Sequence, residues 1–482
     1  MPSTLPSSVP LCIDLDGTLI KTDLLFESLA RLVKQKPWLL LLLPFWGLKG
    51  RAALKRSIAR RISIDVASLP YNSRFVEWLR REKAAGRKLL LVTAADESLA
   101  SQVAGHLGLF DGVIASNGRL NVKGKQKLET LQRQLSGQFE YAGNSWADLE
   151  IWRHCGSAIT VGASPSLLRR VKKDVPRATA FDGRSGSLKH YVAALRVHQW
   201  AKNVLVFVPL ITSHQFLHPT LLLRSALSFI LFSGCSSAQY ILNDLVDLEN
   251  DRRHDTKRRR AFASGDLPLA AGFVLAPVLL AGSLAAAMLL SKLVAAALAA
   301  YFILAFWYSL KLKNIVLLDT FVLSGLYTLR IIVGHLVTGV AFSVWLLSFA
   351  FFLFLSLAFS KRWAELNNVQ RTNGNLAGRG YRVGDMGQVN VFGVCSAFLS
   401  AVIFILYLQS DKVRELYREP ELLWSLSPVF LYWISRLWIR SSRGEVTEDP
   451  VLFVLKDPVT YVVAAVSGLI MLAATAAWPG VN

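Results

Sequence analysis

Nine apolar segments in the second half of the chain constrain its fold more than any other feature. Most of them are long enough for an α-helix to cross the hydrocarbon core of a bilayer, which takes about 20 residues. Hydrophobic residues make up 53% of the 482 residues, and nearly all the long apolar runs lie in 203–478. We therefore expect an all-α, nine-helix transmembrane bundle, with spans near 199–215, 221–242, 270–290, 293–310, 316–337, 343–361, 389–409, 422–439 and 459–478.

The distribution of basic residues predicts which loops face the cytoplasm. If the chain starts there, the loops on that side carry seventeen Lys and Arg, and the outer loops carry five. Such an excess is typical of cytoplasmic loops. The N-terminus lacks the basic and apolar regions of a signal peptide. We expect a multi-pass protein of a bacterial-type inner membrane with a cytoplasmic N-terminal domain, and we attribute the net charge of +21 to this topology, not to nucleic acid binding.

Acidic and basic residues are crowded together after the second apolar segment, in NDLVDLENDRRHDTKRRR (243–260). If this stretch is helical, Asp244, Asp247, Asp251 and Asp255 share one face. A stripe of carboxylates repels itself unless it holds a cation, and Mg²⁺ binds through one or two carboxylates together with substrate phosphates. The basic residues that follow offer charge to a phosphate that the metal does not cover. The stretch therefore predicts Mg²⁺ and a phosphorylated substrate.

The pattern NDxxDxxxD, formed by Asn243, Asp244, Asp247 and Asp251, resembles the first motif of the UbiA-type membrane prenyltransferase superfamily. The resemblance covers about 187–482. It implies a nine-helix bundle in which these aspartates are catalytic and hold the Mg²⁺-diphosphate of a substrate. The second motif that is usual in this superfamily, DxxxD in the loop between spans six and seven, is absent.

The remaining loops resemble one branch of that superfamily, the decaprenyl-phosphate phosphoribosyltransferases. The stretches YSLKLK, LLDTFVLSGLYTLR and KRWAEL carry this likeness together with the first motif. It implies the substrate-binding residues Asn243, His254, Lys257, Arg258, Arg260, Tyr308, Lys311, Lys313, Asp319, Arg330, Lys361, Arg362 and Glu365. Asp319 and Arg330 lie within or at the edge of a span, where an ionised group is costly and is therefore a functional candidate. A structural Asp319–Arg330 pair is the alternative.

The N-terminal part resembles haloacid dehalogenase-like phosphatases. LCIDLDGTLI reads as a strand that ends in DxDGT, which implies Asp14 as the nucleophile and Asp16 as the general acid and base. Thr93, at the end of the strand KLLLVTAA, is the expected phosphate-binding hydroxyl. Lys127 in GKQKLETL matches the third motif, with Lys125 as a close rival.

An asparagine stands where the fourth motif of this family usually has an aspartate. Asn144 and Asp148 follow the strand FEYAG. The resemblance implies a second Mg²⁺ site, formed by Asp14, Asp16, Asn144 and Asp148. Asn144 can bind the metal through its carbonyl oxygen, but one negative charge is lost. A domain without catalytic activity is the alternative that this asparagine leaves open.

Strand and helix patterns alternate through 89–175, which predicts a Rossmann-like α/β domain. Residues 21–87 lack such strands and read as a helical cap. Within them, the apolar run PWLLLLLPFWGL (37–48) is too short to cross a bilayer, so it is either a buried cap helix or a helix in the membrane interface. The expected domains are 1–182, a linker at 183–198 and a membrane domain at 199–482.

The two resemblances together imply a function. Transfer of 5-phosphoribose from phosphoribosyl pyrophosphate to a polyprenyl phosphate leaves a 5-phosphate on the lipid-linked sugar. A phosphatase on the same face of the membrane could then remove that phosphate and give polyprenylphosphoryl-ribose. The expected partners are these two substrates and the bilayer, and a homo-oligomer is compatible with the sequence. The alternative is transfer of a prenyl chain to an aromatic acceptor, with the N-terminal domain as a non-catalytic binding or assembly module.

Overall fold

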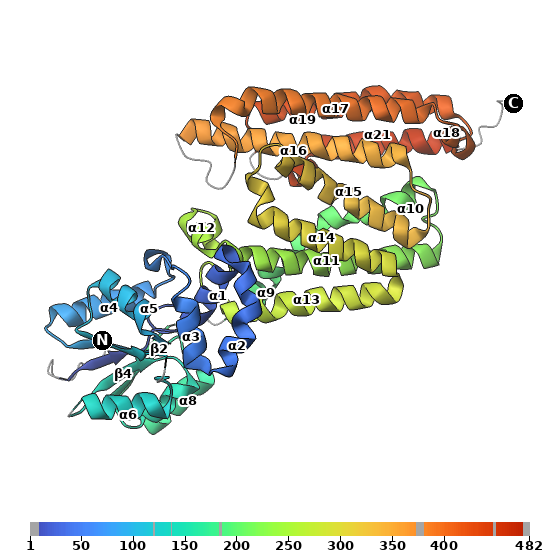
Figure 1. Cartoon of the computed structure of the whole chain (residues 1–482). Coiled ribbons are helices and arrows are strands. Elements are labelled where there is room, and N and C mark those ends of the chain that lie inside the picture. Colours follow the sequence, from blue (N-terminus) through green and yellow to red (C-terminus); the bar gives the residue numbers. More distant parts are fainter. Residues whose placement is uncertain are drawn as a thin grey trace. The chain divides into compact units, whose positions relative to one another are not determined.

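The computed structural model of the chain describes residues 9–118, 121–135, 137–182, 186–372, 380–446 and 450–475 (Figure 1). The chain divides into two compact units. The first unit contains Met1–Val197 and Tyr240–Val278, and the second contains His198–Gln239 and Leu279–Asn482. The stretch with the predicted acidic motif therefore belongs to the first unit.

A parallel six-stranded sheet forms the centre of the first unit. Its strands follow the order β3-β2-β1-β4-β5-β6. They are β1 (Leu11–Ile13), β2 (Leu89–Asp96), β3 (Gly112–Ser116), β4 (Glu140–Gly143), β5 (Ser157–Val161) and β6 (Ala178–Phe181). The helices that connect them are α5 (Glu97–Leu107), α6 (Lys125–Gln134), α7 (Leu149–Trp152) and α8 (Pro165–Asp174). This architecture confirms the predicted α/β domain.

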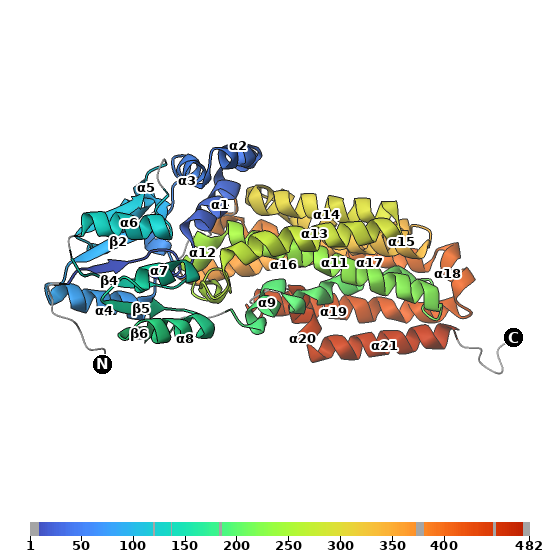
Figure 2. The ribbon, with the colours of Figure 1, turned by 90° about the horizontal axis from the view of Figure 1, so that it is seen from below.

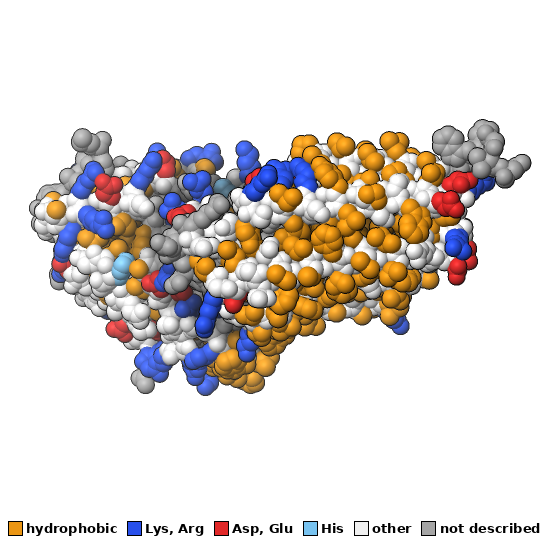
Figure 3. All heavy atoms as spheres, turned by 90° about the horizontal axis from the view of Figure 1, so that it is seen from above, with side chains coloured by type: hydrophobic (Ala, Val, Ile, Leu, Met, Phe, Trp, Pro, Cys, Tyr) orange, Lys and Arg blue, Asp and Glu red, His pale blue; other side chains and the backbone are white. Residues whose placement is uncertain are grey.

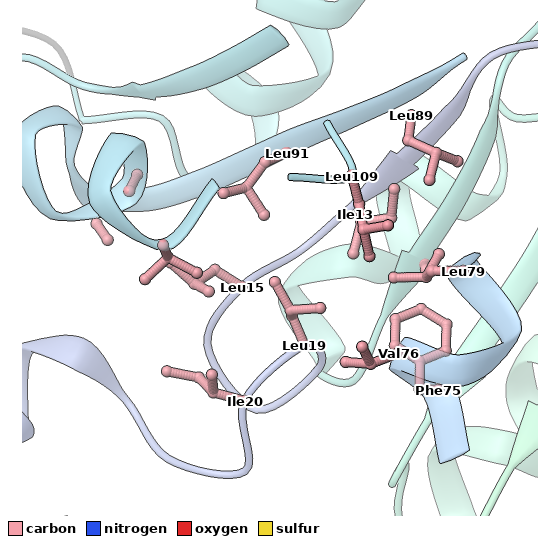
Figure 4. Packing of buried hydrophobic residues seen from close by; sticks show 14 of the residues in the cluster. Ile13, Leu15, Leu19, Ile20, Phe75, Val76, Leu79, Leu89, Leu91 and Leu109 are labelled. Atoms are coloured by element: carbon pink, nitrogen blue, oxygen red, sulfur yellow. The ribbon is translucent and has the colours of Figure 1, made fainter. Parts of the chain in front are cut away.

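The central strands are buried on both faces, as the continuous apolar runs predict. Side chains alternate between the two faces of a strand. Leu11 and Ile13 accordingly join one hydrophobic cluster with Leu89 and Leu91, and Cys12 joins the cluster of the opposite face. Figure 4 shows Ile13, Leu89 and Leu91 in the first of these clusters. This packing fixes the strand ends at which the candidate site residues lie.

The segment between β1 and β2 forms the predicted helical cap. Its helices are α1 (Leu24–Gln35), η1 (Pro37–Leu42), α2 (Leu43–Leu48), α3 (Arg51–Ala59), η2 (Val66–Ser68) and α4 (Ser73–Ala84). In the apolar run Pro37–Leu48 only Trp46 is buried, while Trp38, Leu41 and Phe45 are exposed. The interpretation of this run as a buried cap helix is therefore wrong.

Within the described residues, eight helices are long and apolar enough to cross a membrane. They are α11 (Pro219–Val246), α13 (Leu269–Leu290), α14 (Lys292–Leu310), α15 (Leu318–Thr338), α16 (Val344–Thr372), α17 (Met386–Leu408), α19 (Leu426–Ser442) and α21 (Pro458–Thr475). The first expected span, 199–215, differs: it consists of the 3₁₀ helix η4 (Val197–Phe207) and the short α10 (Val208–Thr212).

Shorter elements connect the long helices: α9 (Leu188–Leu195), α12 (Leu248–Arg253), η5 (Lys257–Arg259), η6 (Leu312–Asn314), η7 (Val383–Asp385), α18 (Asp411–Leu416), η8 (Pro420–Ser425) and α20 (Pro450–Lys456). Positions 183–185 of the expected linker and 476–478 of the last expected span lie outside the described residues. The side of the membrane on which each loop lies stays a prediction.

The second unit is an all-α bundle with a lipid-compatible exterior. Helices α16, α17, α19 and α21 run side by side (Figure 2), and hydrophobic side chains cover much of the face of the helical region that Figure 3 shows. Helix α15 is the most buried of its long helices. A Cβ atom at Gly334 of α15 would collide with the carbonyl oxygen of Val206 and lie 2.8 Å from Pro209 Cδ. Glycine thus allows α15 to pack tightly on η4 and α10.

Candidate active sites

Three of the motifs in the first unit meet at the carboxyl edge of the sheet. Asp14 follows β1, and Asp148 follows the neighbouring β4. Lys127 Nζ, on α6, donates hydrogen bonds to Asp14 Oδ1 and to the Tyr141 hydroxyl oxygen, both at 2.8 Å. The Tyr141 hydroxyl donates to Asp148 Oδ1 at 3.0 Å. The structure therefore joins Asp14, Lys127 and Asp148 in one buried network and favours Lys127 over Lys125.

The other two predicted residues of this site lie on the motif I turn and on β2. Asp16 Oδ1 accepts a hydrogen bond from the Leu24 backbone N–H at 2.8 Å, at the first residue of α1. Thr93 is fully buried on β2, and its Oγ1 accepts from the Ala95 N–H at 3.0 Å. The turn between Asp16 and Leu24 needs Gly17, whose φ of 74° is costly for any other residue.

Burial separates the two carboxyl groups of the motif I turn chemically. It raises the pKa of Asp14 to about 6, and the ammonium group of Lys127 opposes that rise. Burial raises the pKa of Asp16 to about 8, helped by repulsion from Asp23 and Asp14. Between these values Asp14 is ionised and Asp16 is protonated. Such a difference suits a nucleophile beside a general acid.

The fourth-motif residues play different structural parts. Asp148 Oδ2 accepts hydrogen bonds from the backbone N–H of Asn144 at 3.2 Å and from the backbone N–H and hydroxyl of Ser145 at 3.0 and 2.9 Å. The Asn144 side chain instead packs against the motif I turn, where a Cβ atom on Gly17 would lie 2.9 Å from Asn144 Cγ. Asn144 therefore lies against the turn that follows Asp14, while the Asp148 carboxylate holds the loop.

These oxygen donors fit a hard cation. Within the described residues, no group of three or more His, Cys, Asp and Glu side chains is arranged to hold a metal ion. Mg²⁺ needs fewer protein ligands, because it keeps several waters and takes substrate phosphate oxygens. One carboxylate, from Asp14, and one amide oxygen, from Asn144, form a ligand set of this kind.

Sequence reasoning missed two polar residues of this site, Tyr141 and Lys55. Tyr141 points inward from β4, so its position reads as ordinary core. Lys55, on α3 of the cap, donates to the Ala94 carbonyl oxygen at 2.6 Å, and burial lowers its pKa while Asp16 opposes that shift. A small pocket, with room for about one water molecule, is lined by Leu24, Leu25, Ser28, Lys55, Ala95, Asp96 and Leu99. No local pattern marks Lys55, because the cap brings it to the pocket from outside the motifs.

The acidic stretch of the first unit holds two buried aspartates close together. Asp244, on α11, and Asp251, on α12, are 4% and 3% exposed. Arg260 Nη1 donates to Asp244 Oδ1 at 3.1 Å and to Asp251 Oδ2 at 2.7 Å, so both carboxylates share one guanidinium. Arg196, which sequence reasoning missed, forms a second ion pair with Asp244. Burial raises the pKa of Asp251, and Arg260 opposes that rise.

The stripe of four aspartates on one helix is not observed. Helix α11 ends at Val246, and α12 covers only Leu248–Arg253, so Asp255 lies beyond it and is exposed. Asp247 lies between the helices, 3.3 Å from Lys34 Nζ on α1. His254, Lys257 and Arg258 are exposed on the segment that follows, and Asn243 is partly exposed on α11. The interruption of the helix therefore separates Asp247 and Asp255 from the Asp244–Asp251 pair.

A second set of predicted residues meets in the second unit. Arg362 Nε lies 2.7 Å from Asp319 Oδ2, and these side chains are 1% and 0% exposed. Arg362 also pairs with Glu365 and donates to the Tyr308 hydroxyl at 3.4 Å. The Tyr381 hydroxyl, which sequence reasoning missed, donates to Asp319 Oδ1 at 2.7 Å. The structure thus joins Tyr308, Asp319, Arg362 and Glu365, and an Asp319–Arg330 pair is wrong.

Arg330 is a buried cation whose hydrogen-bond partners are neutral groups. Its guanidinium donates to Asn203 Oδ1 at 2.9 Å, to the Leu326 carbonyl oxygen at 2.5 Å and to the Tyr301 hydroxyl at 3.3 Å. It also lies over the rings of Phe232, Tyr301 and Tyr327, at 4.9, 5.0 and 5.3 Å from their centroids. In the described part of the chain no carboxylate pairs with Arg330, so its charge is available to an anion. Lys311 is exposed, and Lys313 and Lys361 are partly exposed.

Comparison with known proteins assigns the two parts of the chain to two families. Residues 204–443 match the UbiA prenyltransferase family, and residues 11–153 match the haloacid dehalogenase-like hydrolases. Over 461 residues the chain is 40% identical to the uncharacterized protein y4nM of Sinorhizobium fredii. The aligned region covers 95% of this chain and 89% of that protein. The chain belongs to the UbiA prenyltransferase family, with a haloacid dehalogenase-like N-terminal domain.

More distant likenesses cover part of this UbiA family member. Over 185 residues it is 34% identical to the decaprenyl-phosphate phosphoribosyltransferase of Mycobacterium tuberculosis. The aligned region covers 38% of this chain and 61% of that protein. A solved UbiA homologue from Archaeoglobus fulgidus, bound to GPP and Mg²⁺, aligns with 59% of this chain and 97% of its own. That alignment has a TM-score of 0.44 and 15% identity.

Proposed function

We propose that this UbiA family member transfers 5-phosphoribose from phosphoribosyl pyrophosphate to a polyprenyl phosphate, and that its N-terminal domain removes the 5-phosphate from the product. The buried guanidinium of Arg330 is the observation that carries the transferase part. No described carboxylate neutralises it. A reaction between two phosphorylated substrates needs such a cation in addition to a metal-binding carboxylate pair. The partial likeness to decaprenyl-phosphate phosphoribosyltransferases supports the same choice.

The transfer step is a substitution at the anomeric carbon of ribose. A phosphate oxygen of the lipid forms the new C–O bond, and the bond to pyrophosphate breaks with its electron pair on the leaving group. The acceptor is already an anion near neutral pH, so no strong general base is required. Asp244 and Asp251, with Asp247 at the break between α11 and α12, are the residues that would hold Mg²⁺. When bound, the metal stabilises the charge of the leaving pyrophosphate.

The cations of the transferase region would hold the two substrates through their phosphates. Arg260 forms ion pairs with Asp244 and Asp251, and Arg196 forms one with Asp244. Metal binding to these aspartates would free the two guanidinium groups to bind a phosphate. Arg330 would bind a second anionic group by its planar fork, since guanidinium matches phosphate geometry. A neutral aromatic acceptor would leave this buried charge unused.

The phosphatase step uses the network at the carboxyl edge of the sheet. The carboxylate of Asp14 attacks the phosphorus of the 5-phosphate, and the protonated Asp16 gives its proton to the departing sugar oxygen. Lys127 and Thr93 would bind the phosphoryl oxygens. Asp16, now ionised, then takes a proton from the water that hydrolyses the aspartyl phosphate. Asp14 and Asn144 would hold Mg²⁺, which screens the negative charge of the phosphate when bound.

Membranes containing the chain test both steps. They receive Mg²⁺, a polyprenyl phosphate and phosphoribosyl pyrophosphate labelled in the ribose. We expect label in the lipid fraction, loss of this label with Asp244→Asn, and normal labelling with Asp255→Asn, a matched exposed acid of the same stretch. We expect Asp14→Asn to accumulate the lipid that still carries the 5-phosphate.

The transferase and phosphatase parts of the proposal can be refuted independently. Incorporation only from a prenyl diphosphate into an aromatic acid would overturn the phosphoribosyl transfer. Identical lipid products from the wild type and Asp14→Asn would overturn the phosphatase step and favour a binding or assembly role for the N-terminal domain.

A further inference from the structure

The cap carries an apolar surface that its own fold leaves uncovered. We name Pro37–Leu48 the cap apolar segment; it is the one shorter apolar helical segment among the described residues. Trp38, Leu41, Phe45 and Leu48 are 63%, 79%, 64% and 86% exposed. Exposed apolar side chains gathered in this way mark a site of interaction with a protein or a membrane.

The cap apolar segment is held firmly on the cap. Trp46 is 9% exposed and packs with Leu32 of α1 and Ile58 of α3 in one hydrophobic cluster. The Arg61 guanidinium lies over its ring, 4.8 Å from the centroid. Leu39, Leu40 and Leu43 of the segment also pack against this cluster, so one side of the segment is fixed on the cap while Trp38, Leu41, Phe45 and Leu48 stay exposed.

The basic residues around the cap apolar segment and the length of the segment indicate which kind of surface covers it. Residues 28–64 contain nine Lys and Arg and no Asp or Glu. Lys49 and Arg51 directly follow the segment and are exposed. Twelve residues are too few to cross a bilayer but enough to lie in its interface, where aromatic and leucine side chains beside basic residues bind anionic lipids. Figure 3 shows hydrophobic side chains projecting at its lower edge beside Lys and Arg side chains.

We propose that the cap apolar segment inserts into the headgroup region of an anionic bilayer, with Trp38, Leu41, Phe45 and Leu48 facing the acyl chains. Eight of the described helices are long and apolar enough to cross a bilayer, so the chain that carries this segment is itself suited to a lipid membrane. A protein partner would more often meet both signs of charge, whereas the exposed basic side chains beside the segment, Lys49 and Arg51, complement anionic headgroups. The proposal does not depend on the proposed function, because it concerns only where the cap lies.

Spin labels on the full chain test this placement. Cys155 and Cys395 are replaced by serine, and single cysteines are introduced by Leu41→Cys, Phe45→Cys or Arg80→Cys, the last an exposed control on α4. The protein is placed in nanodiscs of phosphatidylcholine with phosphatidylglycerol. We expect the labels at 41 and 45 to collide more with oxygen than with a water-soluble nickel chelate, and the label at 80 to show the reverse.

The charge requirement has its own variant. Lys49→Glu with Arg51→Glu should raise the nickel accessibility of the label at 45 several-fold, without changing that at 80. Equal nickel accessibility at 41, 45 and 80 in the unaltered sequence would overturn the proposal. Dipolar broadening between labels at 45 on two copies would overturn it in favour of a contact between chains. Unchanged depth in nanodiscs of phosphatidylcholine alone would overturn the selection of anionic lipid.

Discussion

The buried pair of Arg362 and Asp319 offers a quantitative test of structure against function. Removing one partner of a buried ion pair costs about 3–5 kcal/mol, because the other charge stays buried without compensation. Asp319→Leu leaves Arg362 with Glu365, so we expect the lower end, about 3 kcal/mol. Arg362→Met leaves Asp319, which is fully buried, with the Tyr381 hydroxyl, so we expect about 5 kcal/mol.

The double variant decides what the pair is for. Replacing a buried ion pair by apolar side chains of similar size is often neutral, so Asp319→Leu with Arg362→Met should return to within about 1 kcal/mol of the wild type. The free energy of unfolding is measured with denaturant in detergent micelles, and ribose transfer is measured in the same preparation. If these residues bind substrate, the double variant is stable but transfers no ribose.

A surface pair in the same chain provides the control. Arg153 and Asp174 lie 2.7 Å apart, with side chains 38% and 14% exposed, and Arg153→Met should cost less than about 1 kcal/mol. A double variant at Asp319 and Arg362 that is as unstable as Arg362→Met alone would refute the reasoning from buried charge. A double variant with normal transfer would show that the pair is structural.

Three further substitutions test single residues of the two sites. Gly17→Ala should cost about 1–2 kcal/mol from its left-handed backbone alone and displace Asn144, so phosphate release falls while ribose transfer continues. Asn144→Asp adds a negative charge beside Asp14 and should lower the Mg²⁺ concentration for half-maximal phosphate release; an unchanged value would exclude position 144 from the metal site. Arg330→Lys keeps the charge but cannot keep the contacts of the planar fork, and we expect ribose transfer to fall about tenfold or more with normal folding.

The motifs of the α/β domain could be predicted together because parallel strands impose their geometry. Asp14 and Asp148 follow adjacent strands, whose carboxyl ends share one edge. The alternation of Leu11, Cys12 and Ile13 could not show that Tyr141 would supply a hydroxyl to the same network. A tyrosine on a buried strand reads as core, and only the position of Lys127 reveals its polar contact.

In the acidic stretch, helical periodicity predicts which aspartates lie together only where the chain is actually helical. Asp244 and Asp251 lie together as the periodicity predicts, but the break after Val246 directs Asp247 to a different partner. Helical periodicity could not predict the partners of Asp319 and Arg330. Arg362 and Asn203 reach them from helices distant in sequence, and nothing in the spacing of a single helix specifies such a choice.

The tight packing at Gly334 has a consequence for how the transferase site can vary. Gly334 lies one helical turn after Arg330 on α15, and Val206 lies one 3₁₀ turn after Asn203 on η4. The close approach of Gly334 to Val206 therefore sets the 2.9 Å hydrogen bond between Arg330 Nε and Asn203 Oδ1, one turn away. A side chain at 334 would separate the two backbones and withdraw Asn203 from the guanidinium without touching either residue. A library that searches for new acceptors should therefore vary positions 203, 330 and 334 together, because a side chain at 334 changes the backbone spacing on which the contact between 203 and 330 depends.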